Sequence, residues 1–254
     1  MSATPITTYD VLGRTVVMPC VVRDASAGTA MFEVDAAAAQ GLLPSDRFAV
    51  VESAPGRCQI VLAVIDYRDN DLGAYHEVGI TLFVAPRGSG GEGDGDGEGD
   101  GEGDGGGGES GTFITRLPVD QEFTCAAGRA IWGFPKTVED IGFDYADDHV
   151  TVDLRMDGEP ALRLTLPRGG DETMAPMAMT TYSLIDGVPH ATAFTQGGTG
   201  AQVLVGGDGV SLELGTHPVA GELVGLGLPA AAVMSTWTER MQGVFEVPRA
   251  LTSP

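Results

Sequence analysis

Residues 88–111 constrain the fold more than any other part of this 254-residue chain. Glycine alternates with acidic residues over most of this segment, which carries eight carboxylates and no basic side chain. Such a segment offers nothing to a core and its charges repel one another, so we expect a disordered Gly/acidic insert. Strand-like sequence lies on both sides, at residues 78–84 and 111–117. Because loop-closure entropy rises slowly with length, we predict a single domain over residues 1–254, with this insert between two strands.

Two pairs of apolar segments separated by turn residues predict hairpins. Residues 149–156 alternate apolar with polar side chains and lead through an Asp-Gly pair into residues 161–166. Asp-Gly is a common two-residue hairpin turn. Residues 202–205 and 210–214, joined by Gly-Gly-Asp-Gly, predict a second hairpin.

Helical patterns are few, at residues 35–41, which contain four consecutive alanines, and at residues 229–234. The continuous apolar run 59–67 is typical of a strand buried on both faces. The 38 glycines and 15 prolines suit a sheet protein that is rich in turns. We therefore predict an α+β fold, mainly β, with a closed antiparallel β-barrel or cone-like sheet and few short helices. A closed sandwich is the alternative.

Charge and composition exclude several classes of function. The formal net charge of −22 argues against binding nucleic acid or an anionic membrane surface, both of which attract basic proteins. No apolar run approaches the ~18 residues of a membrane span, and residues 1–5 do not resemble a signal peptide, so we expect cytoplasmic localisation. The three cysteines and four histidines are scattered without metal-ligand spacing. We predict no metal and no cofactor.

Lys136 is the only lysine in the sequence, whereas arginine occurs 13 times. It follows an apolar and aromatic stretch, residues 130–134, and Pro135. Arginine stays protonated, so it cannot replace a lysine that acts as a neutral amine. Burial lowers the pKa of a lysine, and a neutral lysine attacks carbonyl carbons. We therefore predict that Lys136 is buried in a mainly apolar cavity and titrates well below a free lysine.

Two motifs flank the insert in a fixed order. Residues 72–77 read Leu-Gly-Ala-Tyr-His-Glu, and residues 128–136 read Gly-Arg-Ala-Ile-Trp-Gly-Phe-Pro-Lys. With these motifs the chain resembles the acetoacetate decarboxylase family over about residues 31–145. Members of this family form a Schiff base on a lysine that follows an aromatic-Pro pair. The resemblance implies that Lys136 is this lysine and that Glu77 faces it.

The chain departs from the family pattern at two positions beside the motif lysine. Thr137 stands where the first-described decarboxylases carry a second lysine, and Ala130 stands where the family has a glutamate. Without the neighbouring ammonium, burial would have to lower the pKa of Lys136. Schiff-base chemistry is therefore better supported than specificity for acetoacetate.

The resemblance assigns roles to five side chains. Lys136 and Glu77 are the expected catalytic residues, the lysine as nucleophile and the glutamate as a proton carrier. Arg129 is expected to hold the substrate carboxylate as a bidentate clamp, with Phe134 and Trp132 lining the substrate site. The alternatives are that Arg129 pairs with a neighbouring carboxylate for structural support and that both aromatic residues are core residues.

The expected function is that of a lysine Schiff-base enzyme acting on a small keto acid, most simply a carbon–carbon lyase that decarboxylates a β-keto acid. Some members of the wider superfamily condense or dehydrate keto acids, so an aldolase or dehydratase is the first alternative. A non-catalytic small-molecule-binding protein is the second. We expect a keto acid as the partner and a homo-oligomer as the assembly.

Overall fold

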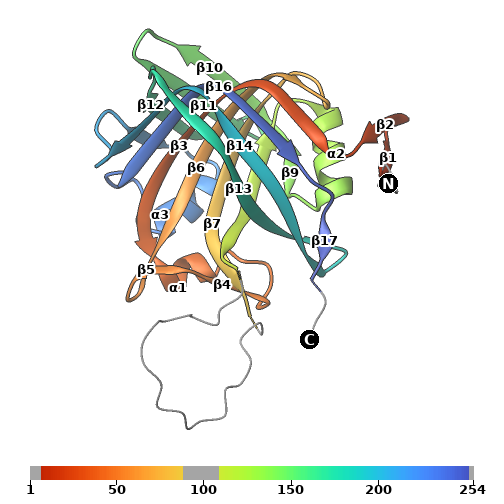
Figure 1. Cartoon of the computed structure of the whole chain (residues 1–254). Helices are drawn as coiled ribbons and strands as arrows, with labels where there is room; N and C mark the ends of the chain where they lie inside the picture. Colours follow the sequence, from red (N-terminus) through yellow and green to blue (C-terminus); the bar gives the residue numbers. More distant parts are fainter. Residues whose placement is uncertain (1–6, 88–108, 252–254) are drawn as a thin grey trace, which may run out of the picture.

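A closed seven-strand β-barrel forms the centre of the molecule (Figure 1). The computed structural model describes residues 7–87 and 109–251. Neighbouring barrel strands are antiparallel except β8 and β13, which are parallel. The predicted mainly β fold with a closed barrel is thus confirmed. In order around the barrel, the strands are β7 (Tyr75–Pro86), β6 (Arg57–Asn70), β3 (Cys20–Asp35), β16 (Met234–Phe245), β14 (Val188–Val205), β13 (Glu172–Ile185) and β8 (Gly111–Val119).

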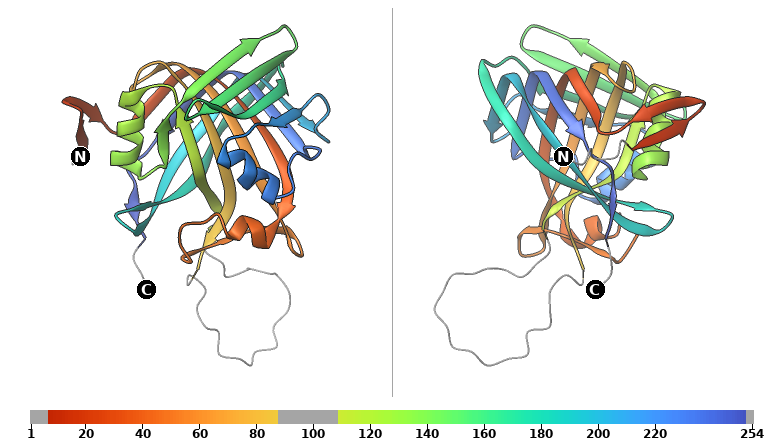
Figure 2. Two further views of the ribbon diagram at one scale, coloured as in Figure 1. Left: turned by 180° about the vertical axis from the view of Figure 1, so that it is seen from behind. Right: turned by 45° about the vertical axis from the view of Figure 1, so that its right-hand side comes forward.

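Short strands extend this barrel at its edges, and one hairpin lies beside it. A separate two-stranded sheet projects next to α2, close to the N-terminus (Figures 1 and 2). The strands that extend the barrel are β4 (Phe48–Val50), β5 (Glu52–Ala54), β9 (Lys136–Val138) and β17 (Arg249–Ala250), and the hairpin consists of β1 (Thr8–Val11) and β2 (Arg14–Val17).

A four-stranded antiparallel sheet packs across the outside of the barrel. The predicted hairpin of residues 149–156 and 161–166 is confirmed as the pair β11–β12. Its turn residues Asp157 and Gly158 both have positive φ, 50° and 79°, as a tight two-residue hairpin turn requires. The strands of this sheet, in spatial order, are β10 (Asp140–Tyr145), β11 (His149–Met156), β12 (Glu159–Pro167) and β15 (Ser211–Leu214).

The second predicted hairpin is wrong, although both of its strands exist. Residues 202–205 end β14 and pair with β16 in the barrel. Residues 211–214 form β15 and pair with β12 in the outer sheet. The glycine-rich connection between them therefore joins two sheets.

Within residues 7–87 and 109–251, three short helices accompany the sheets: α1 (Ala36–Gln40), α2 (Glu122–Trp132) and α3 (Pro218–Gly225). The helix predicted at residues 35–41 is confirmed as α1, which Asp35 caps. The helix predicted at residues 229–234 is wrong, since 229–233 are irregular and Met234 begins β16. No helix in the described part of the chain is long and apolar enough to cross a membrane.

Two apolar cores follow from this arrangement. The first core lies between the barrel and the outer sheet, and the second core lies at the end of the barrel beside α2. Members of the first core include Phe32, Ile60, Leu62, Ile80, Leu82, Val152, Leu154, Leu164, Leu166 and Trp237. Members of the second core include Val22, Ala25, Tyr67, Tyr75, Leu117, Val119, Phe123, Ile131, Trp132 and Phe134.

Strand alternation separates the two faces of the barrel wall. Ile80 and Leu82 of β7 belong to the first core, outside the barrel. Glu77 lies on the opposite face of β7, and its register partners are Ile65 of β6 and Val119 of β8. Directly paired residues share a face of the sheet. These three side chains therefore point into the barrel.

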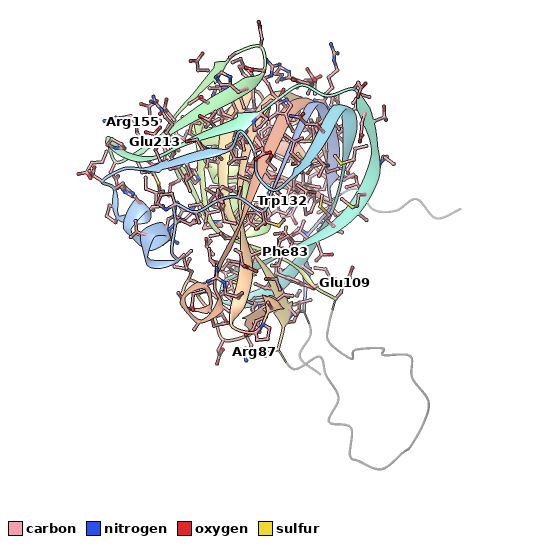
Figure 3. The ribbon with its side chains drawn as sticks, turned by 90° about the vertical axis from the view of Figure 1, so that its left-hand side faces the viewer. Phe83, Arg87, Glu109, Trp132, Arg155 and Glu213 are labelled. Carbon is pink, nitrogen blue, oxygen red and sulfur yellow. The ribbon has the colours of Figure 1, made fainter. Side chains whose placement is uncertain are left out.

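The C-terminal boundary predicted for the insert, residue 111, lies too far along the chain. Residues 88–108 lie outside the described residues, but Gly111 is a buried member of β8 that pairs with Val84. A Cβ at Gly111 would collide with the backbone of Thr180, so the close approach of β13 requires glycine there. Arg87 and Glu109 both lie towards the lower end of the barrel, away from Arg155 and Glu213 of the outer-sheet region (Figure 3).

Candidate active site

The structure brings Lys136 and Glu77 together inside the barrel. Nζ of Lys136 lies 2.7 Å from Oε2 of Glu77, and the two side chains are only 4% and 9% exposed. Lys136 begins β9, which pairs with β8 in parallel so that Lys136 is opposite Leu117. The convergence of the two motif residues therefore results from the register of β9 on β8 and of β8 on β7.

The end of α2 explains how the lysine side chain enters the second core. Gly133 ends the helix with φ 66°, and a Cβ there would collide with the carbonyl oxygen of Leu184. The chain then turns through Phe134 into β9. A Cβ at Gly128 would lie 2.5 Å from Cδ and 2.7 Å from Cε of Lys136. The absence of a side chain at position 128 therefore gives the lysine stem its path along the helix.

Three further polar groups surround the ion pair. Lys136 Nζ donates a hydrogen bond to Oγ1 of Thr124, at 3.2 Å, and lies 4.8 Å from the centre of the Tyr75 ring. The hydroxyl of Tyr67 donates to Oε1 of Glu77, at 3.2 Å. Both carboxylate oxygens of Glu77 thus have a partner, as a buried charge requires.

The predicted low pKa of Lys136 is wrong. Burial pulls the pKa of Lys136 down, but the Glu77 carboxylate and Tyr75 outweigh it, so this pKa lies above its ordinary value. Burial also raises the pKa of Tyr75 to about 12, and burial beside Glu77 holds the pKa of Tyr67 well above its usual range. In the resting site the lysine is therefore an ammonium and both tyrosines are neutral.

The other predicted site residues occupy different surroundings. Arg129 lies on the exposed side of α2, so the structure does not bring it into the buried site with Lys136. Trp132 and Phe134 are buried and stack at 5.8 Å between ring centres, and Trp132 Nε1 donates to the carbonyl of Glu246 at 3.0 Å. Contact of either ring with substrate stays a prediction, and both rings are part of the second core.

Sequence reasoning missed four residues at this site: Tyr67, Tyr75, Thr124 and Gly128. Tyr75 stands two positions before Glu77, which places both on one face of a strand. Thr124 and Gly128 stand four positions apart, which places both on one face of a helix. The spacing signals were thus present, but reading the second required knowing that residues 122–132 are helical.

Metal ligands do not gather in this molecule, as far as residues 7–87 and 109–251 are concerned. No group of three or more His, Cys, Asp or Glu side chains there could hold a metal ion. Lys136, Thr124 and Tyr75 supply hydrogen-bonding and charged groups suited to carbonyl and proton chemistry.

Solved structures similar to this chain share its fold. Acetoacetate decarboxylase from Legionella pneumophila aligns with a TM-score of 0.64 and 18% identity, over 92% of this chain and 87% of the other. The enduracididine biosynthesis enzyme MppR, complexed with the condensation product of pyruvate and imidazole 4-carboxaldehyde, aligns with a TM-score of 0.57 and 14% identity, over 92% and 90% of the two chains. An acetoacetate decarboxylase-like enzyme from Sphingomonas wittichii RW1 aligns with a TM-score of 0.53 and 15% identity, over 93% and 94%.

Sequence comparison adds the family. No curated protein matches the sequence significantly. The family model of acetoacetate decarboxylase (ADC) matches residues 3–242, almost the whole chain. The chain therefore belongs to the acetoacetate decarboxylase family.

Proposed function

We propose that this protein is an enzyme that forms a Schiff base between Lys136 and a small keto acid, most simply to decarboxylate a β-keto acid. The observation that carries the proposal is the 2.7 Å contact between the only lysine of the chain and Glu77, inside a closed barrel. A buried ion pair is a weak source of stability, since apolar side chains of similar volume often serve as well or better. Its presence in the second core therefore favours a chemical role.

The ion pair provides a route to the neutral amine that the reaction needs. The raised pKa of Lys136 keeps it protonated at rest, and an ammonium is not a nucleophile. Transfer of one proton from Nζ to Oε2 of Glu77 converts the pair into an amine and a carboxylic acid with no change in total charge. Burial favours this neutral form more than water does, because desolvation penalises both charges. Glu77 is thus the proposed proton acceptor.

The reaction then follows from the chemistry of the amine. Lys136 attacks the ketone carbon, and loss of the ketone oxygen as water, with protons supplied by the Glu77 acid, leaves an iminium. The bond to the β-carboxylate breaks, carbon dioxide leaves, and the electron pair moves toward the iminium nitrogen to give an enamine. Protonation of the enamine carbon and hydrolysis release the ketone and the free lysine.

Thr137 stands at the position where the first-described decarboxylases carry a second lysine. Its side chain is exposed, whereas that of Lys136 is buried, because successive residues of β9 point to opposite faces. In this chain the pKa of Lys136 therefore depends on burial, which lowers it, and on Glu77 and Tyr75, which raise it.

A condensation or dehydration on the same imine is the second candidate. The groups in contact with Lys136 are Glu77, Thr124 and Tyr75, which can move or hold protons, and Arg129 is exposed. None of these contacts, which are those of the described residues, is a guanidinium, and a site with proton-carrying groups at the amine suits an enamine that attacks a second carbonyl. The relative MppR, bound to a condensation product, shares the fold.

Borohydride trapping tests the proposal. The protein is incubated with a panel of β-keto and α-keto acids, reduced, and measured intact by mass spectrometry. We expect one substrate-derived mass per chain, mapped to Lys136 by peptide analysis. The N-terminal amine is the only competing primary amine, because the chain has one lysine.

Carbon dioxide release separates the candidates. Release with a β-keto acid supports decarboxylation, whereas trapping without release, together with a condensed or dehydrated product, supports the second candidate. A protein that stays unlabelled across the panel, from neutral to mildly alkaline pH, would be a binding protein and the enzyme proposal would be abandoned.

A further inference from the structure

The barrel wall has a weak seam between β8 and β13. These two strands form the parallel contact of the barrel, and they pair at only two positions, Thr112 with Thr181 and Phe113 with Tyr182. Beyond that point β8 continues beside β9, while β13 continues beside β14. The two strands thus diverge, and the chain around Gly133 fills the upper part of the gap, against Leu184 and Ile185.

A crevice of about 290 Å³ lies in this seam. Its volume is close to the lower limit of small-molecule sites. Most of its lining is apolar and comes from β8, β13, the end of α2 and the loop after α1. The lining residues that the argument uses are Leu42, Ile114, Phe134, Pro135, Ser183 and Leu184.

Two parts of the crevice lining are close neighbours of the lysine in the fold. Phe134 and Pro135 line it and directly precede Lys136 in the chain. Ile114 lines it from β8, three positions before Leu117, the register partner of Lys136. At the rise of a β-strand, three positions correspond to about 10 Å. An extended chain of about six to eight bonds would span that distance.

One buried side chain of this lining has an unpaired hydroxyl, whereas the other polar side chains of the lining, those of Thr115, Arg116 and Tyr182, have hydrogen-bond partners. Ser183 is only 3% exposed and lines the crevice, and its Oγ has no hydrogen-bond partner within the described chain. Buried hydroxyls in folded proteins are nearly always hydrogen-bonded, because an unpaired one is destabilising. The hydroxyl of Ser183 therefore has an unused hydrogen bond at the edge of the crevice.

We infer that this crevice binds the side chain of the substrate: a keto acid whose reactive carbonyl reaches Lys136 carries an apolar tail of about six carbons, or an aromatic ring, that lies against Phe134 and Leu184. A hydroxyl or carbonyl oxygen on that tail hydrogen-bonds to Ser183. The inference rests on the proposed Schiff-base function and narrows its substrate class. Acetoacetate, with one methyl group beyond its ketone, leaves the crevice unfilled.

A substrate series tests the tail. β-Keto acids with the same reactive head and alkyl tails of one to seven carbons, or a phenyl group, are compared by the concentration that gives half-maximal borohydride trapping. We expect that concentration to fall by about fourfold per added methylene until the crevice is full, in line with the transfer of apolar surface from water. A flat series would overturn the inference.

Filling the crevice from Leu42 supplies the matched comparison. Leu42 is half-buried and lines the crevice, whereas the adjacent Leu43 is half-buried and does not. Leu42→Trp should raise the half-saturating concentration of the long-tailed acids, relative to that of acetoacetate, by roughly tenfold or more, the affinity of two methylenes. Leu43→Trp should change neither. Equal behaviour of the two variants would count against the crevice.

A substitution of Ser183 tests the proposed hydrogen bond to the tail. Ser183→Ala should weaken the trapping of tails that carry an oxygen by roughly twofold to tenfold, the usual range for one hydrogen bond, and leave plain alkyl tails unaffected. Equal losses for both kinds of tail would contradict a hydrogen bond to Ser183.

A non-covalent ligand separates failure of the crevice from failure of the chemistry. Binding of 4-phenylbutanoate, which has no ketone, is measured by calorimetry on the wild type, Leu42→Trp and Lys136→Arg. Binding to the wild type and to Lys136→Arg, but not to Leu42→Trp, supports the crevice even if no keto acid is trapped. Trapping without any preference for a tail would instead leave the proposed function standing and overturn the crevice.

Discussion

The two cores of this molecule are both lined by apolar side chains, but only the second core encloses charged groups. The first core, between the barrel and the outer sheet, is filled by side chains such as Ile60, Leu164 and Trp237. The second core, beside α2, encloses Lys136 and Glu77, which are the only buried lysine, arginine, aspartate or glutamate side chains among residues 7–87 and 109–251. Desolvating two charges costs several kcal/mol per ion, and their attraction often only offsets it. The first core therefore reflects stability alone, whereas the second core includes a pair whose presence requires another reason.

Replacing the lysine is the most severe test of this comparison. Lys136→Arg keeps the positive charge but cannot form an imine, so we expect complete loss of borohydride trapping and of turnover. The measurement is the intact mass after reduction with a keto acid that labels the wild type.

Folding is controlled by a second variant, because the bulkier arginine meets Gly128 closely. The double variant Lys136→Met and Glu77→Gln removes both charges with little change in volume, and we expect it to remain folded and unlabelled. Labelling of either variant at any position other than the N-terminal amine would contradict the role of Lys136.

Removing the Glu77 carboxylate tests the comparison through the pH dependence of trapping. Glu77 is the chief group that raises the pKa of Lys136, while burial lowers it, so Glu77→Gln should move this pKa below that in the wild type. The neutral amine then forms at lower pH, and the trapping rate should rise to its plateau at lower pH than in the wild type. Turnover should still fall by roughly 10²–10⁴-fold, because the proton carrier is lost. Trapping and turnover are followed from pH 6 to pH 10.

The first core supplies the control for Glu77→Gln. Breaking a buried ion pair by removing one partner destabilises a protein by about 3–5 kcal/mol. Leu164→Ala, which is fully buried in the first core, should cost about 2–5 kcal/mol. Denaturant unfolding should therefore show similar losses, while only Glu77→Gln shifts the pH profile. A matching shift in Leu164→Ala would mean that the profile reports stability.

Two helical glycines test the packing of the lysine stem. A methyl group at Gly128 overlaps Lys136, whereas one at Gly221 in α3 meets nothing within 4 Å. Glycine to alanine in a helix stabilises by up to ~1 kcal/mol where space allows, so Gly221→Ala should unfold slightly later and trap normally. Gly128→Ala should displace the lysine stem and slow trapping by up to roughly 100-fold, the loss that a misplacement of about 1 Å in an active site can cause. Equal trapping rates in the two variants would show that the lysine needs no such path.

The fold and part of the site were predictable from local patterns. The β11–β12 hairpin follows from alternation and an Asp-Gly turn, both of which are local. The convergence of Lys136 and Glu77 was predicted from two motifs, since the residues of a family motif occupy the same positions in the fold of each member. The pairing of β15 with β12 was not predictable in this way, because strand partners far apart in sequence are chosen by which faces become buried.

The errors at the site share one physical cause. Arg129 neighbours Gly128 in sequence, but one helical step turns it by about 100°, from the lysine stem to solvent. The pKa of Lys136 depends on a carboxylate 2.7 Å away, and that distance is set by the registers of three strands. Composition around Lys136 revealed burial, which lowers a lysine pKa, but not the partner that raises it.

The smallest effect is expected from replacing the Gly/acidic segment. Replacing residues 88–108 by a short turn removes seven carboxylates and should leave trapping by Lys136 within about twofold of the wild type. The reason is geometric: Val84 and Gly111 are direct partners on neighbouring strands, which lie about 5 Å apart, so a short turn can join them. Glu109 is kept, because its carbonyl accepts a hydrogen bond from the Tyr182 hydroxyl at 2.6 Å, and Tyr182 lines the seam crevice.

Addition of calcium tests whether the same segment binds a metal ion. Its carboxylates lack the apolar positions of calcium-binding glycine-aspartate repeats, so micromolar calcium should change neither the thermal midpoint nor the trapping rate of the full chain. The shortened variant serves as the blank for any calcium effect on the barrel. A calcium-dependent rise in thermal midpoint that disappears in this variant would show that residues 88–108 stabilise the end of the barrel at β7 and β8. In that case the comparison of the two cores would be incomplete, because a bound calcium ion would also contribute to the stability of the protein.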